Sequence, residues 1–181
     1  MNLFVISLPI VEVFNKKRVL KKNYQLSETD LLLCHLLEEN ARLSMTELAE
    51  RIGLSVTATS EHIRKLEQQG IITGYHAHLA PAAIGLDITA FVFVWVEGSA
   101  HYPAFIERCK KVPAILECHA ITGEASHLLK VRLTNTAALE ELLSTIQQWR
   151  GVQRTQTSIV LSTPIETTQL LRHVSPPKRR R

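Results

Sequence analysis

Residues 44–75 read SMTELAERIGLSVTATSEHIRKLEQQGIITGY, and this stretch decides the fold of the N-terminal part of the chain. Ser44 with Glu47 forms an S-x-x-E capping box, which is typical of the first turn of a helix. Gly53 follows nine residues after Ser44 and is expected to end that helix, because glycine tolerates a positive φ. The pattern predicts one short helix that closes in a tight turn.

A second helix is predicted to begin at the capping residue Ser55 and to run to Gln69, where Gly70 stops it. Upstream, Ser27 with Asp30 is a weaker capping box that opens a helix with a stripe of leucines. The small residue at the crossing of the last two helices is Ala49. Apolar positions clamp them together: Leu48, Ile52, Leu54, Ile63 and Leu66. Three helices with this spacing predict a helix-turn-helix.

The third helix has a polar face suited to base edges in the major groove of duplex DNA. If Thr59, Ile63 and Leu66 face the core, a rotation of about 100° per residue leaves the polar side chains outside. Polar groups that donate and accept can read base edges, and the helix N-terminus favours a phosphate. The DNA-contacting residues are predicted to be Ser55, Thr57, Ser60, Glu61, Arg64 and Lys65. The alternative is a solvated face on an ordinary three-helix bundle.

The overall charge contributes little to this hypothesis. The chain carries a formal charge of +4, but the tail at residues 178–181 supplies four positive charges, so the remainder is neutral. The third helix sets Glu61 and Glu67 against Arg64 and Lys65 and has no net charge. We therefore expect weak binding by one monomer and useful affinity only from a dimer that presents two such helices.

The C-terminal part alternates strand and helix patterns in the order βαββαβ. An apolar β-branched run predicts a buried strand over residues 88–97, and a strand pair or wing is expected before it at 71–79. The remaining elements are expected as helix 102–111, strands 115–122 and 127–133, helix 137–150 and strand 152–161. This order predicts a ferredoxin-like α+β domain behind the helix-turn-helix.

Five segments follow from these patterns: an N-terminal extension at 1–24, a DNA-binding domain at 25–80, a linker at 81–87, a ferredoxin-like domain at 88–166, and a segment with a basic tail at 167–181. The extension is either a strand-like arm or a start-site artefact. Its apolar run at 3–14 is too short to span a bilayer, and basic residues follow it, unlike a secretory signal. We expect no membrane partner, and three cysteines without a pairing framework indicate the reducing cytoplasm.

Several motifs together resemble those of one known family. The N-terminal part contains Asn40-Ala41-Arg42, Glu47-Leu48-Ala49, Gly53-Leu54-Ser55, Arg64-Lys65-Leu66-Glu67 and Gly70-Ile71-Ile72-x-Gly74-Tyr75. The C-terminal part adds Glu117-Cys118-His119, Gly123, Leu128-Leu129-Lys130-Val131 and Gly151-Val152. Over residues 26–165 the chain resembles the Lrp/AsnC, or feast/famine, transcription regulators. The resemblance implies a winged helix-turn-helix joined to a ferredoxin-like effector-binding domain, assembly into homodimers and octamers, and an amino acid or related metabolite as effector.

One motif departs from the family pattern. Relatives usually read Gly-Asp-aromatic-Asp-aromatic, and this chain reads Gly123-Glu124-Ala125-Ser126-His127. Ser126 replaces an acidic residue that holds the ligand's amino group in relatives, and a hydroxyl cannot offer that charge-assisted bond. An altered ligand and the loss of effector binding both stay open. The effector-binding residues are predicted to be Gly123, Glu124, Ser126, His127, Thr155 and Thr157.

Other side-chain groups point to no further chemistry. The eight histidines lack the spacing of zinc ligands, and catalytic triads, phosphate-binding loops and cofactor motifs are absent, so we expect no metal, cofactor or enzyme. His119 and His127 are candidates for a pH-sensitive pocket; the alternative is a pair of ordinary sheet histidines. Trp95 and Trp149 are interpreted as core or interface anchors. An enzyme that resembles tetrapyrrole decarboxylases on the same scaffold is the alternative function.

Overall fold

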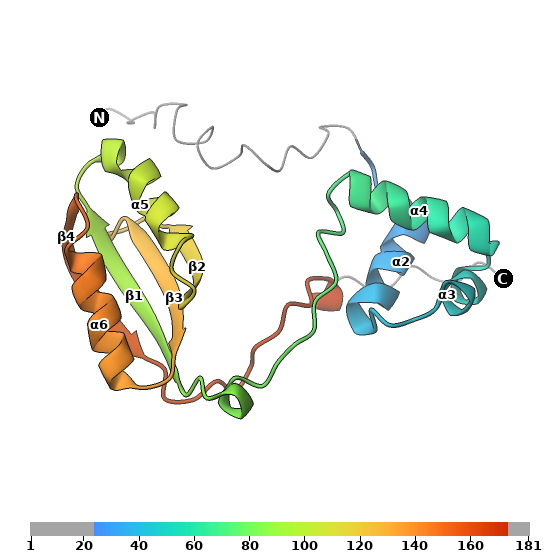
Figure 1. The fold of residues 1–181 in the computed structure, drawn as a ribbon. Helices are drawn as coiled ribbons and strands as arrows, with labels where there is room; N and C mark the ends of the chain where they lie inside the picture. Colours follow the sequence, from blue (N-terminus) through green and yellow to red (C-terminus); the bar gives the residue numbers. More distant parts are fainter. Residues whose placement is uncertain (1–23, 174–181) are drawn as a thin grey trace. The chain divides into compact units, whose positions relative to one another are not determined.

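The computed structural model describes residues 24–173, which divide into two compact units (Figure 1). One unit comprises His78–Ile165, and the other comprises residues 24–77 together with 166–173. Residues 1–23 of the expected N-terminal extension and the whole basic tail at 178–181 lie outside the described residues. In the described part of the chain, no helix is long and apolar enough to cross a membrane.

The unit of residues 24–77 is built from three helices, α2 (Glu28–Glu39), α3 (Met45–Ile52) and α4 (Val56–Gln68). Both predicted capping boxes form: the Ser27 and Ser44 hydroxyls accept from the N–H groups of Asp30 and Glu47, and each carboxylate accepts a hydrogen bond in return. The buried core contains one or two residues from each helix: Leu33, Leu48, Ile63 and Leu66. The helix-turn-helix predicted from capping and apolar spacing is confirmed.

The second unit has the predicted βαββαβ order. Its elements are β1 (Ile88–Val96), α5 (Tyr102–Cys109), β2 (Ile115–Ala120), β3 (His127–Leu133), α6 (Thr136–Gln147) and β4 (Val152–Ile159), with short 3₁₀ turns at Pro81–Ile84 and Ser99–His101. The strands form one antiparallel sheet in the order β2-β3-β1-β4. The ferredoxin-like α+β fold is therefore confirmed, with helix ends up to three residues shorter than predicted.

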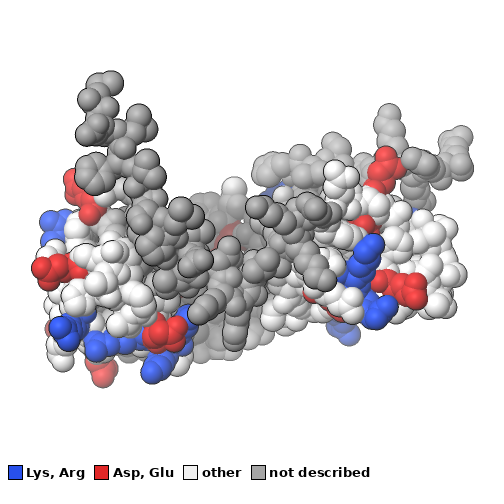
Figure 2. Space-filling model, turned by 90° about the horizontal axis from the view of Figure 1, so that it is seen from above, with Lys and Arg blue, Asp and Glu red and all other residues white. Residues whose placement is uncertain are grey.

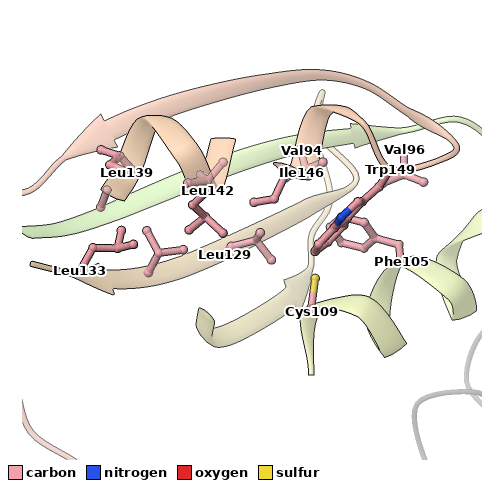
Figure 3. Packing of buried hydrophobic residues seen from close by; sticks show 13 residues of the cluster. Val94, Val96, Phe105, Cys109, Leu129, Leu133, Leu139, Leu142, Ile146 and Trp149 are labelled. Atoms are coloured by element: carbon pink, nitrogen blue, oxygen red, sulfur yellow. The ribbon is translucent and has the colours of Figure 1, made fainter. Parts of the chain in front are cut away.

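Both helices of this unit cover the same face of the sheet, and the core lies between the helices and the sheet (Figures 1 and 3). Burial alternates along β3 from His127 to Leu133, as expected for a strand with one covered face. Phe105 of α5 and Ile146 of α6 pack on the buried valines of β1, and Trp149 closes the end of the core next to Phe105. Of its two interpretations, core residue or interface anchor, the structure supports the first for Trp149.

The expected strand pair at 71–79 does not form. No strand is assigned between α4 and β1 in the described chain, and residues 73–80 are exposed. Only Ile71 and Ile72 pack against the helical core. A strand needs a neighbouring strand for its backbone hydrogen bonds, and this segment has none, so it runs as an irregular connection whose start is held by the Tyr75 hydroxyl donating to Glu67 (3.1 Å).

Candidate nucleic-acid interface and effector region

Helix α4 buries its apolar row and exposes the predicted DNA-contacting row. Thr59, Ile63 and Leu66 are at most 4% exposed, and they anchor the helix on the three-helix core. The six predicted residues are all exposed: Ser55, Thr57, Ser60, Glu61, Arg64 and Lys65. The structure therefore places the whole predicted row on one continuous, solvent-facing side of α4.

The turn before α4 is fixed by backbone geometry. Gly53 adopts φ 73° and ψ 33°, the left-handed region that glycine reaches without a steric penalty. The N–H groups of Gly53 and Leu54 both donate to the carbonyl of Ala49, at 2.9 and 3.0 Å. Ala49 is 4% exposed, as a small residue at a helix crossing should be. These contacts set the angle at which α4 leaves α3.

Thr59 occupies a clamp position where a larger aliphatic residue would be usual. It is fully buried, and its hydroxyl donates to the Ser55 carbonyl at 2.9 Å. A buried hydroxyl without a partner would be costly, but this bond within α4 satisfies it. Thr59 is therefore compatible with a tightly packed helix-turn-helix.

A buried carboxylate on α2 holds α4 in place, and the sequence analysis did not anticipate it. Asp30 is 2% exposed and its carboxylate contacts three groups: the His62 Nδ1 (2.8 Å), the Tyr24 hydroxyl (2.8 Å) and the Ser27 N–H (3.0 Å). His62 belongs to α4, next to the exposed row. In the sequence, Asp30 is visible only as half of a capping box, because the contact with His62 spans 32 residues.

The surface of both units mixes charges of both signs. On the face that Figure 2 presents, Lys and Arg side chains are interspersed with Asp and Glu. On α4, the Lys65 ammonium lies 4.9 Å from the centre of the Tyr24 ring, which fixes one edge of the exposed row. On that face the described residues show no broad basic field, so the local geometry of α4 is the feature that suits this unit to a polyanion.

Some of the predicted effector residues lie in an exposed turn, and others lie on strands and are buried or half-buried. Gly123 and Glu124 are exposed in the turn between β2 and β3. His127 is fully buried at the start of β3, where its ring packs against Tyr102 (4.7 Å between centroids) and Phe105 (4.8 Å). Its burial lowers the pKa of the imidazole below its usual value.

Ser126 is occupied by bonds within the protein. Its hydroxyl accepts from the Val96 N–H and donates to the Val94 carbonyl, both at 2.9 Å, and His127 Nδ1 lies 3.0 Å away. The side chain thus continues the ladder between β3 and β1 beyond its last backbone pair, Val94 with His127. A ligand could use the Ser126 hydroxyl only in exchange for one of these bonds.

Thr155 and Thr157 lie on β4, on the helix-covered face. Thr155 pairs with Val94, and Val94 pairs with His127, so the three form one cross-strand row. The Thr155 hydroxyl accepts from Gln147 of α6 at 2.8 Å. The structure brings Thr155 into the same row as His127, two strands away, and leaves Gly123 and Glu124 on the turn outside it.

His119 and His127 do not share a pocket. His119 pairs with Leu128, so it projects from the open face of the sheet, whereas His127 projects under the helices. His119 is exposed and lies 2.9 Å from Glu117. The two histidines differ by one register position, and alternate positions on paired strands face opposite sides. The hypothesis of a shared pocket is therefore wrong, and the alternative, two separate sheet histidines, agrees with the structure.

Each unit, and the chain as a whole, is similar to known proteins. Residues 26–73 match the family model for a winged helix-turn-helix DNA-binding domain, and residues 89–170 match that for the Lrp/AsnC ligand-binding domain. The HTH-type transcriptional regulator LrpA of Mycobacterium tuberculosis is 34% identical over 141 residues, covering 78% of this chain and 93% of the relative. The leucine-responsive regulatory protein of Escherichia coli is 33% identical over 162 residues, covering 88% and 97%.

The solved structures to which the chain is similar are also those of transcriptional regulators. A transcriptional regulator from Neisseria meningitidis, crystallised as a complex with L-methionine, has a TM-score of 0.76 at 35% identity and covers 82% of this chain and 99% of its own. AsnC of Escherichia coli has a TM-score of 0.75 at 30% identity, covering 81% and 99%. A feast or famine regulatory protein from M. tuberculosis complexed with L-methionine has a TM-score of 0.73 at 34% identity, covering 80% and 98%.

The names of the two sequence relatives are those of transcriptional regulators, which rules against the tetrapyrrole decarboxylase alternative. The family model that matches the helix-turn-helix is one of DNA binding. The chain is a DNA-binding transcriptional regulator and belongs to the Lrp/AsnC family.

Proposed function

We propose that this regulator binds duplex DNA in the cytoplasm by inserting α4 into the major groove, with Ser55, Thr57, Ser60, Glu61, Arg64 and Lys65 as its contacts. The observation that carries the proposal is the exposure of this entire row on a helix whose other side is locked to the core. The row combines donors and acceptors, as direct readout of base edges requires.

The proposal is tested on a duplex selected from a random-sequence library, with affinity measured by mobility shift at moderate salt. Arg64→Ala should weaken specific binding by about 1–3 kcal/mol if Arg64 reads a base. The matched control is Arg150→Ala, an exposed arginine of the other unit. Equal affinities for wild type and Arg64→Ala would remove Arg64 from the interface.

The same proposal includes a homodimer, which can assemble further into an octamer. The open face of the sheet supports it, because Phe91, Phe93 and Trp95 follow each other along β1 on the face that none of the described helices covers. The Arg154 guanidinium lies 3.9 Å from the centre of the Trp95 ring. A row of large apolar residues on an open sheet is typical of a subunit interface.

We further propose that the C-terminal unit binds a small amino-acid-like effector near Gly123, Glu124, Ser126, His127, Thr155 and Thr157. Two of the similar solved structures contain L-methionine, which supports this class of ligand. The internal bonds of Ser126 favour a ligand held differently from that of relatives with an acidic residue at this position. Calorimetry with the twenty amino acids and related keto acids tests the proposal; no heat from any of them would leave an effector-free regulator.

A further inference from the structure

Two of the three cysteines meet in the core of the C-terminal unit. Cys109 is the last residue of α5, is 2% exposed and belongs to the buried cluster between the helices and the sheet (Figure 3). Cys118 lies on β2 and packs against the same cluster. It pairs with the buried Leu129 of β3, which places its side chain on the helix-covered face, toward α5.

Both thiols lie in the same core cluster, and they differ in environment. The interaction between them raises the pKa of Cys109 and lowers that of Cys118. Cys118 is also the more accessible of the two, since it is half-buried on the edge strand β2. Accessibility and thiolate character together determine which cysteine reacts with an oxidant.

We propose that Cys109 and Cys118 form a redox-active dithiol site, which hydrogen peroxide oxidises to an intramolecular disulfide. The Cys118 thiolate attacks one oxygen of hydrogen peroxide, the O–O bond breaks, and Cys118 becomes a sulfenic acid while the departing hydroxide takes a proton from the solvent and leaves as water. The Cys109 sulfur then attacks the Cys118 sulfur, an S–S bond replaces the S–O bond, and the hydroxide takes the Cys109 proton to leave as a second water. The dithiol loses two electrons, and the peroxide gains them.

The chain geometry suits a disulfide at this place. Only the short connection between α5 and β2 separates the two elements, and their contact brings both sulfurs into one cluster. Two thiols that share one cluster where α5 and β2 are in contact need little backbone movement to bond. The third cysteine differs: Cys34 of α2 belongs to the other unit, and its burial, with Asp30 and Glu38 nearby, raises its pKa to about 11.

A disulfide here would restrain the elements that border the effector region. α5 carries Tyr102 and Phe105, whose rings contact His127, and β2 leads directly into the turn that contains Gly123. Oxidation would tie the end of α5 to β2. The site lies on the helix-covered face, so its oxidation does not require the open face of the sheet to be free.

The experiment treats the reduced full chain with one equivalent of hydrogen peroxide, blocks remaining thiols with N-ethylmaleimide and maps the peptides by mass spectrometry. We expect a Cys109–Cys118 cross-link within one chain, a blocked Cys34, and complete reversal by dithiothreitol. A map in which both cysteines stay blocked by the maleimide, or in which Cys34 is the oxidised residue, would overturn the proposal. So would a cross-link found only between two chains.

Three variants assign the two roles. C118S should not oxidise at Cys109, and C109S should accumulate a sulfenic acid on Cys118 that dimedone traps. The matched control C34S should form the cross-link as fast as the wild type. Oxidation of Cys109 in C118S at the wild-type rate would exclude Cys118 as the attacking thiol. If either core variant does not fold, the peptide map of the wild type and of C34S decides the matter.

Discussion

Asp30 is a buried carboxylate on which three polar contacts of the DNA-binding unit converge. Burial alone would raise the pKa of this carboxyl, but the hydrogen bonds from His62, the Ser27 N–H and Tyr24 outweigh it and lower the pKa to about 2. A carboxylate held in this way stabilises the folded state above its unfolded pKa of 3.8. Asp30 therefore contributes both to folding and to the position of α4.

Replacing Asp30 by Asn should destabilise the DNA-binding unit by about 2 kcal/mol at neutral pH, because the depressed pKa corresponds to about that free energy. Hydrogen exchange of the α4 amides measures the effect locally. The matched control is Asp87→Asn, an exposed carboxylate of the other unit. In the wild type the contribution should fade as the pH drops from about 4 to about 2; a variant with unchanged exchange would contradict this role.

His127 gives the C-terminal unit a dependence on pH. Its folded pKa lies below the ordinary value of 6.5 because the ring is buried, so the unfolded chain takes up the proton first as the pH falls. Stability should therefore decrease below pH 6.5. The stability that depends on a neutral, buried His127 is fully present only above that pH, where His127 is neutral in both the folded and the unfolded chain.

The expected result is a smaller loss of stability between pH 8 and pH 5.5 in His127→Phe than in the wild type. Urea denaturation at the two pH values measures the loss, and only the difference between them is compared, since the variant also lacks the contact with Ser126. His119→Phe, on the open face, should retain the wild-type loss. Identical losses in wild type and His127→Phe would show that His127 is not the titrating group.

At the scale of the secondary-structure elements, the starts of α3 and α4 could be predicted because the capping residues lie close together in the sequence. Ser44 with Glu47 and Ser55 with the N–H of Ala58 are contacts across three residues, so the sequence displays both partners together. The strand pair at 71–79 was not predictable in the same way. A strand depends on a partner that can lie anywhere in the chain, and apolar residues at Ile71 and Ile72 indicate packing without indicating pairing.

The capping of α3 can be tested on its own. Ser44→Ala removes the side chain that accepts from the Glu47 N–H and should lower the free energy of unfolding of the DNA-binding unit by about 1 kcal/mol. Ser60→Ala is the matched control, because Ser60 lies on the exposed face inside α4 and has no capping role. Equal destabilisation by both substitutions would indicate that the cap contributes nothing specific.

The alternation of apolar residues along the strands predicted the fold of the C-terminal unit, but it did not predict all contacts of the candidate effector region. Alternation along β3 indicates which residues face the core, and it places His127 on the buried face. The bonds of Ser126 with Val94 and Val96 span about thirty residues, so no local pattern contains them. The same holds for the interaction between Cys109 and Cys118, which depends on the return of β2 along α5.

At the scale of the whole molecule, we expect specific DNA binding to require two copies of the chain. α4 carries no net charge, so one copy lacks the electrostatic attraction that sustains binding to DNA. Phe93→Asp, in the middle of the open aromatic row, should dissociate the dimer in sedimentation velocity and abolish specific DNA binding with it. The control Leu79→Asp changes an exposed apolar residue in the segment before β1, outside the sheet, and should leave the dimer intact.

The position of α4 on DNA is best tested by methylation interference on the selected duplex. Methyl groups at guanine N7 lie in the major groove, and those at adenine N3 lie in the minor groove. We predict that N7 methylation blocks binding at two clusters about one helical turn, or a multiple of it, apart, and that Arg64→Ala removes one guanine from each cluster. Interference confined to adenine N3, or a pattern that Arg64→Ala leaves unchanged, would contradict the account.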